Sequence, residues 1–181
     1  MAIHAGVREH LESADLVGGA RSGDPAALGM LYDAFGAGLF RLAYRLTGTR
    51  EDAEDVVHDV FVGLPEALTR YEERGRLGAW LRRVTARVAL MRQRKARRRQ
   101  EVGLDSAAGV ASSAHGTSED AALRAALDAL PADQRAVVVL KEMEGYTHAE
   151  IATTLGISPV TSRVRLLRAL RRMRRQLEED K

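Results

Sequence analysis

The residues with the clearest chemistry lie near the C-terminus, where arginine recurs at helical spacing. Arg163, Arg168 and Arg175 belong to a run that contains seven arginines and no acidic residue. Arginine keeps its charge at every relevant pH and presents a planar fork of five N–H donors. Such a fork binds phosphate oxygens and guanine edges. The segment therefore predicts a surface that binds nucleic acid.

A helical wheel divides this segment into two faces. Ser162, Leu166, Ala169, Leu170 and Met173 share the face that we expect to pack against the rest of the protein. The residues predicted to contact DNA are Thr161, Arg163, Val164, Arg165, Leu167, Arg168, Arg171 and Arg172. Val164 and Leu167 either meet thymine methyl groups or pack against a neighbouring helix.

The residues before this helix predict its partner in a helix-turn-helix. Thr147 and Glu150 have the spacing of a capping box. Gly156 stands at the expected turn, and Ser158 followed by Pro159 begins the next helix. In a helix-turn-helix the second helix enters the major groove. The alternative is an ordinary helical hairpin with a solvated basic face.

A second basic run lies between residues 82 and 99, on a segment that also has helical periodicity. The apolar face of the wheel carries Trp80, Leu81, Val84, Val88 and Met91. Another face carries Arg83, Arg87 and Arg94, for which we predict contacts with DNA phosphates.

Acidic side chains gather on an earlier segment, for which we expect one helix from Thr49 to Leu68. If Val56, Val57, Val60 and Phe61 face the core, an acidic ridge remains on the other side. This ridge consists of Asp52, Asp55, His58 and Asp59. An acidic ridge on a protein with two basic surfaces favours a second partner, a basic protein. The alternative is a solvated first turn whose acids are favoured by the helix dipole.

The amino-acid composition excludes several classes of protein and of functional site. The chain has 181 residues, a net charge of +3, 45% apolar residues and no cysteine. Disulfides and thiolate metal sites are thus excluded. The five histidines lack metal-ligand spacing and no glycine-rich phosphate loop is present, so we expect no cofactor, no metal and no enzyme activity. We see neither a signal peptide nor an apolar stretch long enough for a membrane, and we expect a cytoplasmic protein.

These segments predict an all-α fold of two small helical domains joined by a flexible linker. We expect an N-terminal extension over residues 1–14, a first domain over 15–99, a linker over 100–118 and a helix-turn-helix domain over 119–181. In the first domain, Asp24 and Pro25 begin a helix that ends at Gly48. Gly36 and Gly38 interrupt its period, which predicts one bent helix or two short ones.

The order of the motifs resembles a known family. "LAYRLTGTREDAEDVVHDVFVGL" and "AWLRRVTARV", followed by "ALDALPADQRAVVVLKEMEGYTHAEIATTLGIS", resemble bacterial RNA polymerase sigma factors of the extracytoplasmic-function (ECF) type within the sigma-70 family. The resemblance implies that the first domain is region 2, which binds the clamp helices of the largest polymerase subunit and the promoter's minus-ten element. The second is then region 4, which binds the flap of the other large subunit and the minus-thirty-five element. It also implies an anti-sigma factor as a partner.

The resemblance assigns roles residue by residue. Asp55, His58 and Asp59 match the clamp-binding positions, where the family more often has Gln and Glu at the last two. Arg87 stands where asparagine is usual and Met91 where aspartate is common, so base recognition by that asparagine does not carry over. The loop from Tyr71 to Gly78 corresponds to the loop that holds a flipped base during melting.

Two other functions compete with this interpretation. One is a one-component transcription regulator, whose N-terminal half would dimerise or sense a ligand. The other is an RNA-binding or anti-sigma-type adaptor. For the sigma factor we expect residues 100–118 to lack a fixed structure in the free chain and to be ordered by the polymerase.

Overall fold

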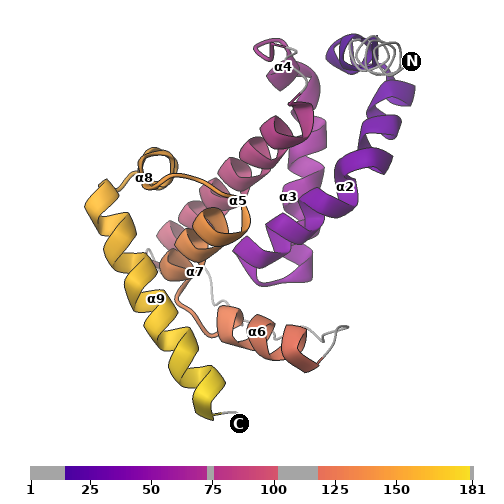
Figure 1. The fold of residues 1–181 in the computed structure, drawn as a ribbon. Helices are drawn as coiled ribbons and strands as arrows, with labels where there is room; N and C mark the ends of the chain where they lie inside the picture. The colour runs from indigo at the N-terminus through magenta and orange to yellow at the C-terminus, as the bar shows by residue number, and fades with distance from the viewer. Residues whose placement is uncertain (1–14, 73–75, 102–117, 180–181) are drawn as a thin grey trace, which may run out of the picture.

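The fold is helical throughout the part of the chain that the structure describes. The computed structural model describes residues 15–72, 76–101 and 118–179. Residues 15–21 are helical, followed by α2 (Pro25–Thr47), α3 (Arg50–Val62), α4 (Leu64–Leu68) and α5 (Leu77–Glu101). The C-terminal unit has α6 (Ser118–Asp128), α7 (Ala132–Val138), the π-helical turn η1 (Val139–Met143), α8 (His148–Leu155) and α9 (Pro159–Glu179) (Figure 1). The predicted all-α class is confirmed.

Helix α2 is one continuous helix and not two. The Asp24 carboxylate accepts hydrogen bonds from the backbone N–H groups of Ala26 and Ala27 and so caps its start. Gly48 ends it in the left-handed conformation, with φ of 89°. Gly36 lies buried inside the helix, where the Tyr32 ring covers its Cα. The glycine therefore serves side-chain packing and does not break the helix.

The segment that starts at Thr49 divides into two helices. The Thr49 hydroxyl accepts a hydrogen bond from the Asp52 N–H and caps α3 as expected. α3 ends at Val62, and after Gly63 the chain begins the short α4, with Pro65 in its first turn. Proline has no N–H to donate to the preceding turn. The expectation of one helix through Leu68 was thus wrong at Gly63.

The core of the N-terminal unit is formed by α2, α3 and α5. Leu31 and Leu42 of α2 pack with Val56 of α3 and Leu81 of α5, all fully buried. The wheel of α5 was wrong for Met91, which is 57% exposed. The buried side of α5 is formed by Leu81, Thr85, Ala86, Ala89 and Leu90 and does not include Met91.

The C-terminal unit contains the predicted helix-turn-helix geometry. Thr147 and Glu150 form both hydrogen bonds of the capping box at the start of α8. Gly156 ends α8 with φ of 66°, and the Ser158 hydroxyl accepts a bond from the Thr161 N–H at the start of α9. Ser162 is the one polar residue on the packing face of α9 that is fully buried, and its hydroxyl is 2.9 Å from Nδ1 of His148. This bond satisfies a group that would otherwise be costly to bury.

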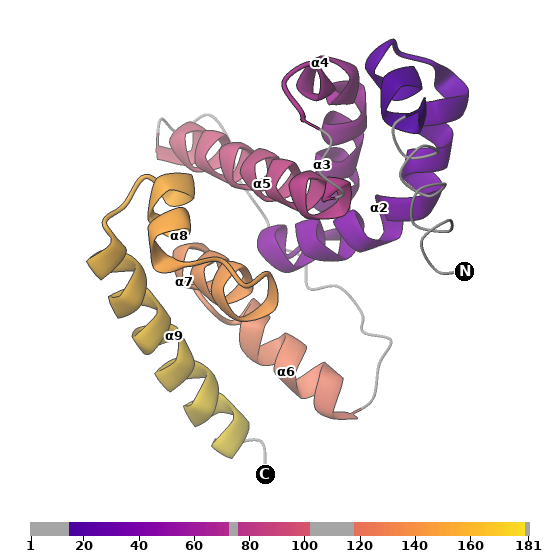
Figure 2. The ribbon, with the colours of Figure 1, turned by 45° about the horizontal axis from the view of Figure 1, so that its top comes forward.

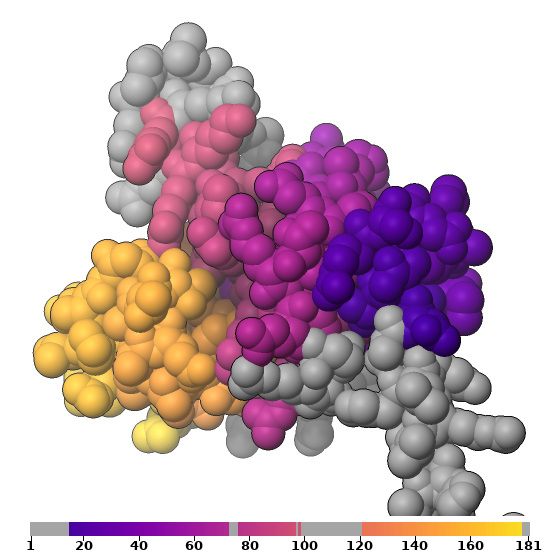
Figure 3. Space-filling model, turned by 90° about the horizontal axis from the view of Figure 1, so that it is seen from above, coloured from indigo at the N-terminus to yellow at the C-terminus, as the bar shows by residue number. Residues whose placement is uncertain are grey.

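The two units lie against each other. In Figure 2, α8 lies beside α5 and α7 lies beside the end of α2, while α9 runs along the outer side. The space-filling view shows the orange residues of the C-terminal unit abutting those of the N-terminal unit (Figure 3). The guanidinium group of Arg135 on α7 lies next to Gly48, at the carboxyl end of α2, where the helix dipole favours a cation.

Candidate protein-binding and nucleic-acid-binding surfaces

The acidic ridge of α3 forms on one side of the N-terminal unit, as the wheel predicted. Asp52, Asp55, His58 and Asp59 are all exposed, while Val56 and Val60 beneath them are buried. Asp52 also accepts a hydrogen bond from the Thr49 hydroxyl at 2.6 Å. Three carboxylates are therefore presented on a rigid helix.

Arg92 of α5 binds two of these carboxylates. Its guanidinium donates hydrogen bonds to both Asp55 and Asp59. Partial burial by itself lowers the pKa of Arg92, but the hydrogen bond and charge of Asp59, together with the charge of Asp55, raise that pKa overall. Arg92 thus fixes α3 to α5 and spaces the two carboxylates. One oxygen of each carboxylate accepts these bonds.

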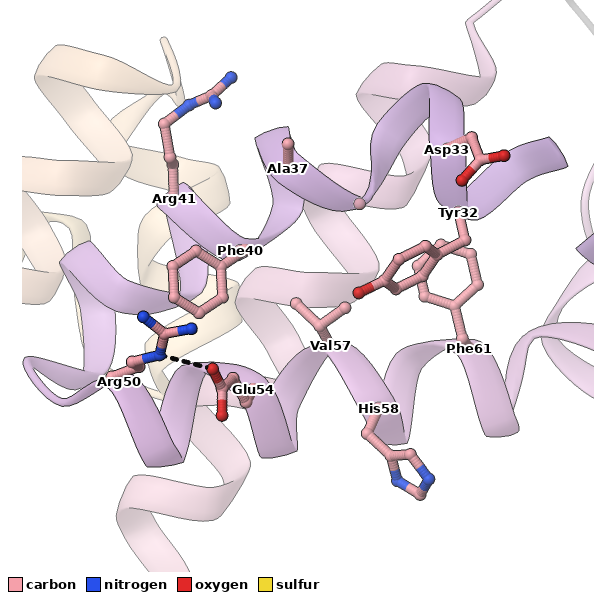
Figure 4. Close-up of a pocket in the computed structure, with 11 residues that line it drawn as sticks. Tyr32, Asp33, Ala37, Phe40, Arg41, Arg50, Glu54, Val57, His58 and Phe61 are labelled. Carbon is pink, nitrogen blue, oxygen red and sulfur yellow. Dashed lines mark hydrogen bonds and ion pairs between the residues drawn. The ribbon is translucent and has the colours of Figure 1, made fainter. Parts of the chain in front are cut away.

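A groove runs along the other side of α3. It has a volume of about 730 Å³ and lies between α2 and α3. Figure 4 shows Tyr32 and Phe61 together at one end, with ring centroids 5.1 Å apart, and the Arg50–Glu54 ion pair at the other. His58 of the ridge also lines this groove. The ridge is therefore bordered by a partly apolar groove.

The three arginines predicted to contact phosphates share one stripe of α5, and all are exposed. Arg83 donates a hydrogen bond from Nη2 to Oε1 of Glu150 on α8 over 3.2 Å. Arg94 donates from Nη2 to the backbone carbonyl of Thr154 over 2.8 Å. Arg87, between them, has no ion pair among the described residues. Two members of the stripe are thus engaged by the C-terminal unit.

Helix α9 presents most of its predicted contact residues to solvent. Arg163, Val164, Leu167, Arg168, Arg171 and Arg172 are exposed. Thr161 is half-buried, and its hydroxyl lies 2.9 Å from that of Ser158. Arg165 is also half-buried and forms an ion pair with Asp133 of α7 at 3.2 Å. Leu170, which we placed on the packing face, is 43% exposed, whereas Ser162, Ala169 and Met173 are buried and Leu166 is partly buried against the core.

Comparison with known proteins identifies both units. Residues 31–99 match the family model "Sigma-70 region 2", and residues 120–173 match "Sigma-70, region 4". The ECF RNA polymerase sigma factor SigL of Mycobacterium tuberculosis (strain H37Rv) is 35% identical over 171 residues, which cover 90% of this chain and 96% of SigL. The chain belongs to the ECF sigma factors.

Further relatives agree in sequence and in fold. SigE of Mycolicibacterium smegmatis is 35% identical over 144 residues, which cover 75% of this chain but only 56% of SigE. The structure of CnrH in complex with the cytosolic domain of CnrY is similar with a TM-score of 0.54 and 26% identity, covering 92% of this chain and 97% of CnrH. As a sigma factor, the chain directs RNA polymerase to promoters. The comparisons do not favour the alternative, a one-component transcription regulator.

The sequence did not predict the contacts that the acidic ridge of α3 and the arginine stripe of α5 make within the chain. Arg92 was counted in the basic run but given no role. Since it lies nine residues after Arg83, or two and a half helical turns, it faces the opposite side of α5. That spacing was the available signal. Glu150 was recognised as a helix cap, but its pairing with Arg83 depends on how the two regions pack, which no local pattern contains.

Region 4 also contains two buried polar groups with altered acidity. The Glu144 carboxylate is only 6% exposed and lies 3.8 Å from Arg82; its burial raises its pKa, against the charges of Arg82 and Arg45. The Tyr146 hydroxyl is buried and has no hydrogen-bond partner among the residues that the structure describes, and burial raises the pKa of Tyr146 to about 12. Within residues 15–72, 76–101 and 118–179, no helix is long and apolar enough to span a membrane, and no cluster of metal-ligating side chains is found.

Proposed function

We propose that this sigma factor binds core RNA polymerase through the acidic ridge of α3, formed by Asp52, Asp55, His58 and Asp59. The observation that carries the proposal is the exposure of all four side chains on a helix whose other face is buried. The partner surface would be the clamp helices of the largest subunit, which the family resemblance names. Complementary charges of this kind steer the association of two proteins and fix how their surfaces align.

The two basic helices are proposed to bind the promoter. Arg83, Arg87 and Arg94 on α5 would contact phosphates around the minus-ten element. The predicted residues of α9 would enter the major groove of the minus-thirty-five element, with Arg168 in a position to bind a base edge and Arg171 a phosphate. The exposure of the α9 arginines supports this division. Arg165 contributes less, because Asp133 already neutralises it.

The remaining assignments are proposals on the same basis. Residues 15–99 form region 2 and residues 119–181 form region 4, and residues 100–118 connect them, although most of this connection lies outside the described residues, as does the 1–14 extension. Region 4 would also contact the flap of the second large subunit. The family resemblance implies an anti-sigma factor as a further partner, and the similar protein CnrH was solved in complex with another protein, the cytosolic domain of CnrY. The chain would act in the cytoplasm, by binding and not by catalysis.

The ridge is tested by removing its charge without removing its hydrogen bonds. Asp55→Asn with Asp59→Asn leaves oxygen acceptors for Arg92, so region 2 should stay folded. We expect core polymerase to bind this variant at least about tenfold more weakly, as for other buried interface charges. Glu51→Gln with Glu54→Gln removes the same charge from the same helix outside the ridge and serves as the matched control. Equal affinity of the folded ridge variant and the control would reject the ridge.

A further inference from the structure

The first half of α9 presents an apolar patch to solvent, formed by Val160, Val164 and Leu167. Val160 is 63% exposed, Val164 40% and Leu167 50%. Their spacing of four and then three residues places them on one face of the helix. Val160 precedes the buried Ala169 by nine residues, or about two and a half turns, so the patch faces away from the core of region 4. The helices α6, α7 and α8 all contact α9, yet their packing does not cover the patch.

Arginine side chains surround this patch. Arg163 and Arg168 flank it and are exposed, and the exposed Arg171 continues the same side in the next turn. Helix α9 contains no acidic residue before Glu178. A protein that covered the patch would remove these charges from water, which is costly unless carboxylates pair with them. DNA brings phosphate groups to the arginines and base edges to the patch between them. The occupant that fits both is the major groove of DNA.

Polar groups at the start of α9 are already engaged within the protein. The Ser158 hydroxyl accepts a hydrogen bond from the Thr161 N–H, and the two hydroxyl oxygens lie 2.9 Å apart. Arg165 is paired with Asp133 at 3.2 Å. The first two turns therefore present mainly methyl groups to a base edge, with Arg163 at the border. In the major groove, the apolar group on a base edge is the 5-methyl group of thymine.

We infer that Val160 and Val164 determine promoter specificity by contacting the 5-methyl groups of thymines in the minus-thirty-five element, and that Leu167 extends this contact by one turn. The inference rests on the proposed entry of α9 into that element, because a helix-turn-helix contacts base edges with the N-terminal residues of its second helix. Val160 and Val164 are about 6 Å apart along the helix axis, less than two base-pair steps of about 3.4 Å. The contacted thymines consequently belong to about three neighbouring base pairs.

Deoxyuridine tests this contact, because it differs from thymidine only by the missing methyl group. The probe is a promoter fragment whose start site depends on the chain, with the thymines of its minus-thirty-five element replaced one at a time. Holoenzyme is assembled from core polymerase and the full chain, and its affinity is measured by competition with the unmodified fragment. We expect about fourfold weaker binding for each contacted thymine, the effect of one buried methyl group. Replacement of thymines between the two promoter elements should change nothing.

Val160→Ala and Val164→Ala remove the side chains that contact the methyl groups, and alanine at these exposed positions should leave the helix folded. We expect each variant to lose the distinction between thymine and deoxyuridine at its own base pair and to keep it elsewhere. Leu170→Ala is the matched control, because Leu170 is exposed on the same helix but lies about a third of a turn from Val164. The control should keep the full distinction.

Three results would overturn the inference. They are a minus-thirty-five element without thymine, equal affinity for thymine and deoxyuridine at every position, and a distinction that survives unchanged in both valine variants. The proposed DNA binding of α9 has a separate test, in which Arg171→Ala should weaken binding of the unmodified fragment and lower its salt dependence. Normal binding by Arg171→Ala would reject α9 as the DNA-binding helix. Weaker binding by Arg171→Ala, with no effect of deoxyuridine, would reject the methyl contact alone.

Discussion

The bridge between α5 and α3 can be tested by replacing Arg92 with methionine, which keeps an unbranched apolar stem and removes the charge. Arg92 binds Asp55 and Asp59 together, and its side chain is 36% exposed, against 55% and 45% for the two carboxylates. Exposed ion pairs contribute about 0.2–1 kcal/mol each. For two pairs on one guanidinium we expect a loss of about 1 kcal/mol in the free energy of unfolding of region 2. For a domain of this size that lowers Tm by about 4–8 °C.

The assay uses the only tryptophan of the chain. Trp80 is half-buried in region 2, and its ring lies 4.8 Å from that of Tyr71, so its fluorescence reports unfolding of this region in urea. Arg50→Met is the control, since the Arg50–Glu54 pair is local to α3 and should contribute less than about 0.5 kcal/mol. The effect of Arg92→Met should shrink at 1 M salt, where the Debye length is about 3 Å. An equal loss at low and high salt would show that Arg92 acts through packing of its stem and would refute the ion-pair argument.

Three further predictions test other parts of region 4. Glu144→Gln should stabilise the protein at pH 7. Because the pKa of Glu144 is raised above its ordinary value of 4.5, the folded protein favours the protonated carboxyl, so Glu144 contributes to stability below pH 4.5 and this contribution is lost as the pH rises. The stability gained by Glu144→Gln, measured by urea titration, should therefore vanish below pH 4.5. A less stable variant at pH 7 would contradict this. Tyr146→Phe removes a buried hydroxyl without a partner among the described residues and should leave stability unchanged or raise it by about 1 kcal/mol, measured by thermal unfolding; a clear loss would reveal a missing hydrogen bond. Arg171→Ala should reduce the log–log salt slope of DNA binding by about 0.9, whereas Arg165→Ala, whose arginine is paired with Asp133, should change it less; equal slopes would reject this difference.

Local signals in the sequence predicted the helices and their ends well. The cap at Asp24, the capping box at Thr147 and the glycine at position 48 are all present. Each depends on residues only a few positions apart, so one sequence contains the whole signal. The break at Gly63 was missed because Pro65 was not weighed against the apolar period. Met91 was placed on the wrong side because the buried face of α5 follows Leu81, Ala89 and Leu90, and the apolar wheel did not separate this face from the one that carries Met91.

The contacts between distant elements were not accessible in the same way. The pairing of Arg92 with Asp59 joins residues 33 positions apart, and that of Arg83 with Glu150 joins residues 67 apart. Such contacts depend on how helices and regions pack, and surface charges have several equally good partners in an unpacked chain. The sequence therefore indicated which side chains form the ridge and the stripe, but not which of them are already paired.

Transcription by the reconstituted holoenzyme tests the account most directly. The purified chain is added to core RNA polymerase on fragmented genomic DNA, and the 5′ ends of the transcripts are sequenced. The account predicts new start sites that depend on the chain and share two upstream elements, and that are lost with Asp55→Asn/Asp59→Asn but kept with Glu51→Gln/Glu54→Gln. Failure of the unmodified chain to create any start site, or full activity of the ridge variant, would contradict it.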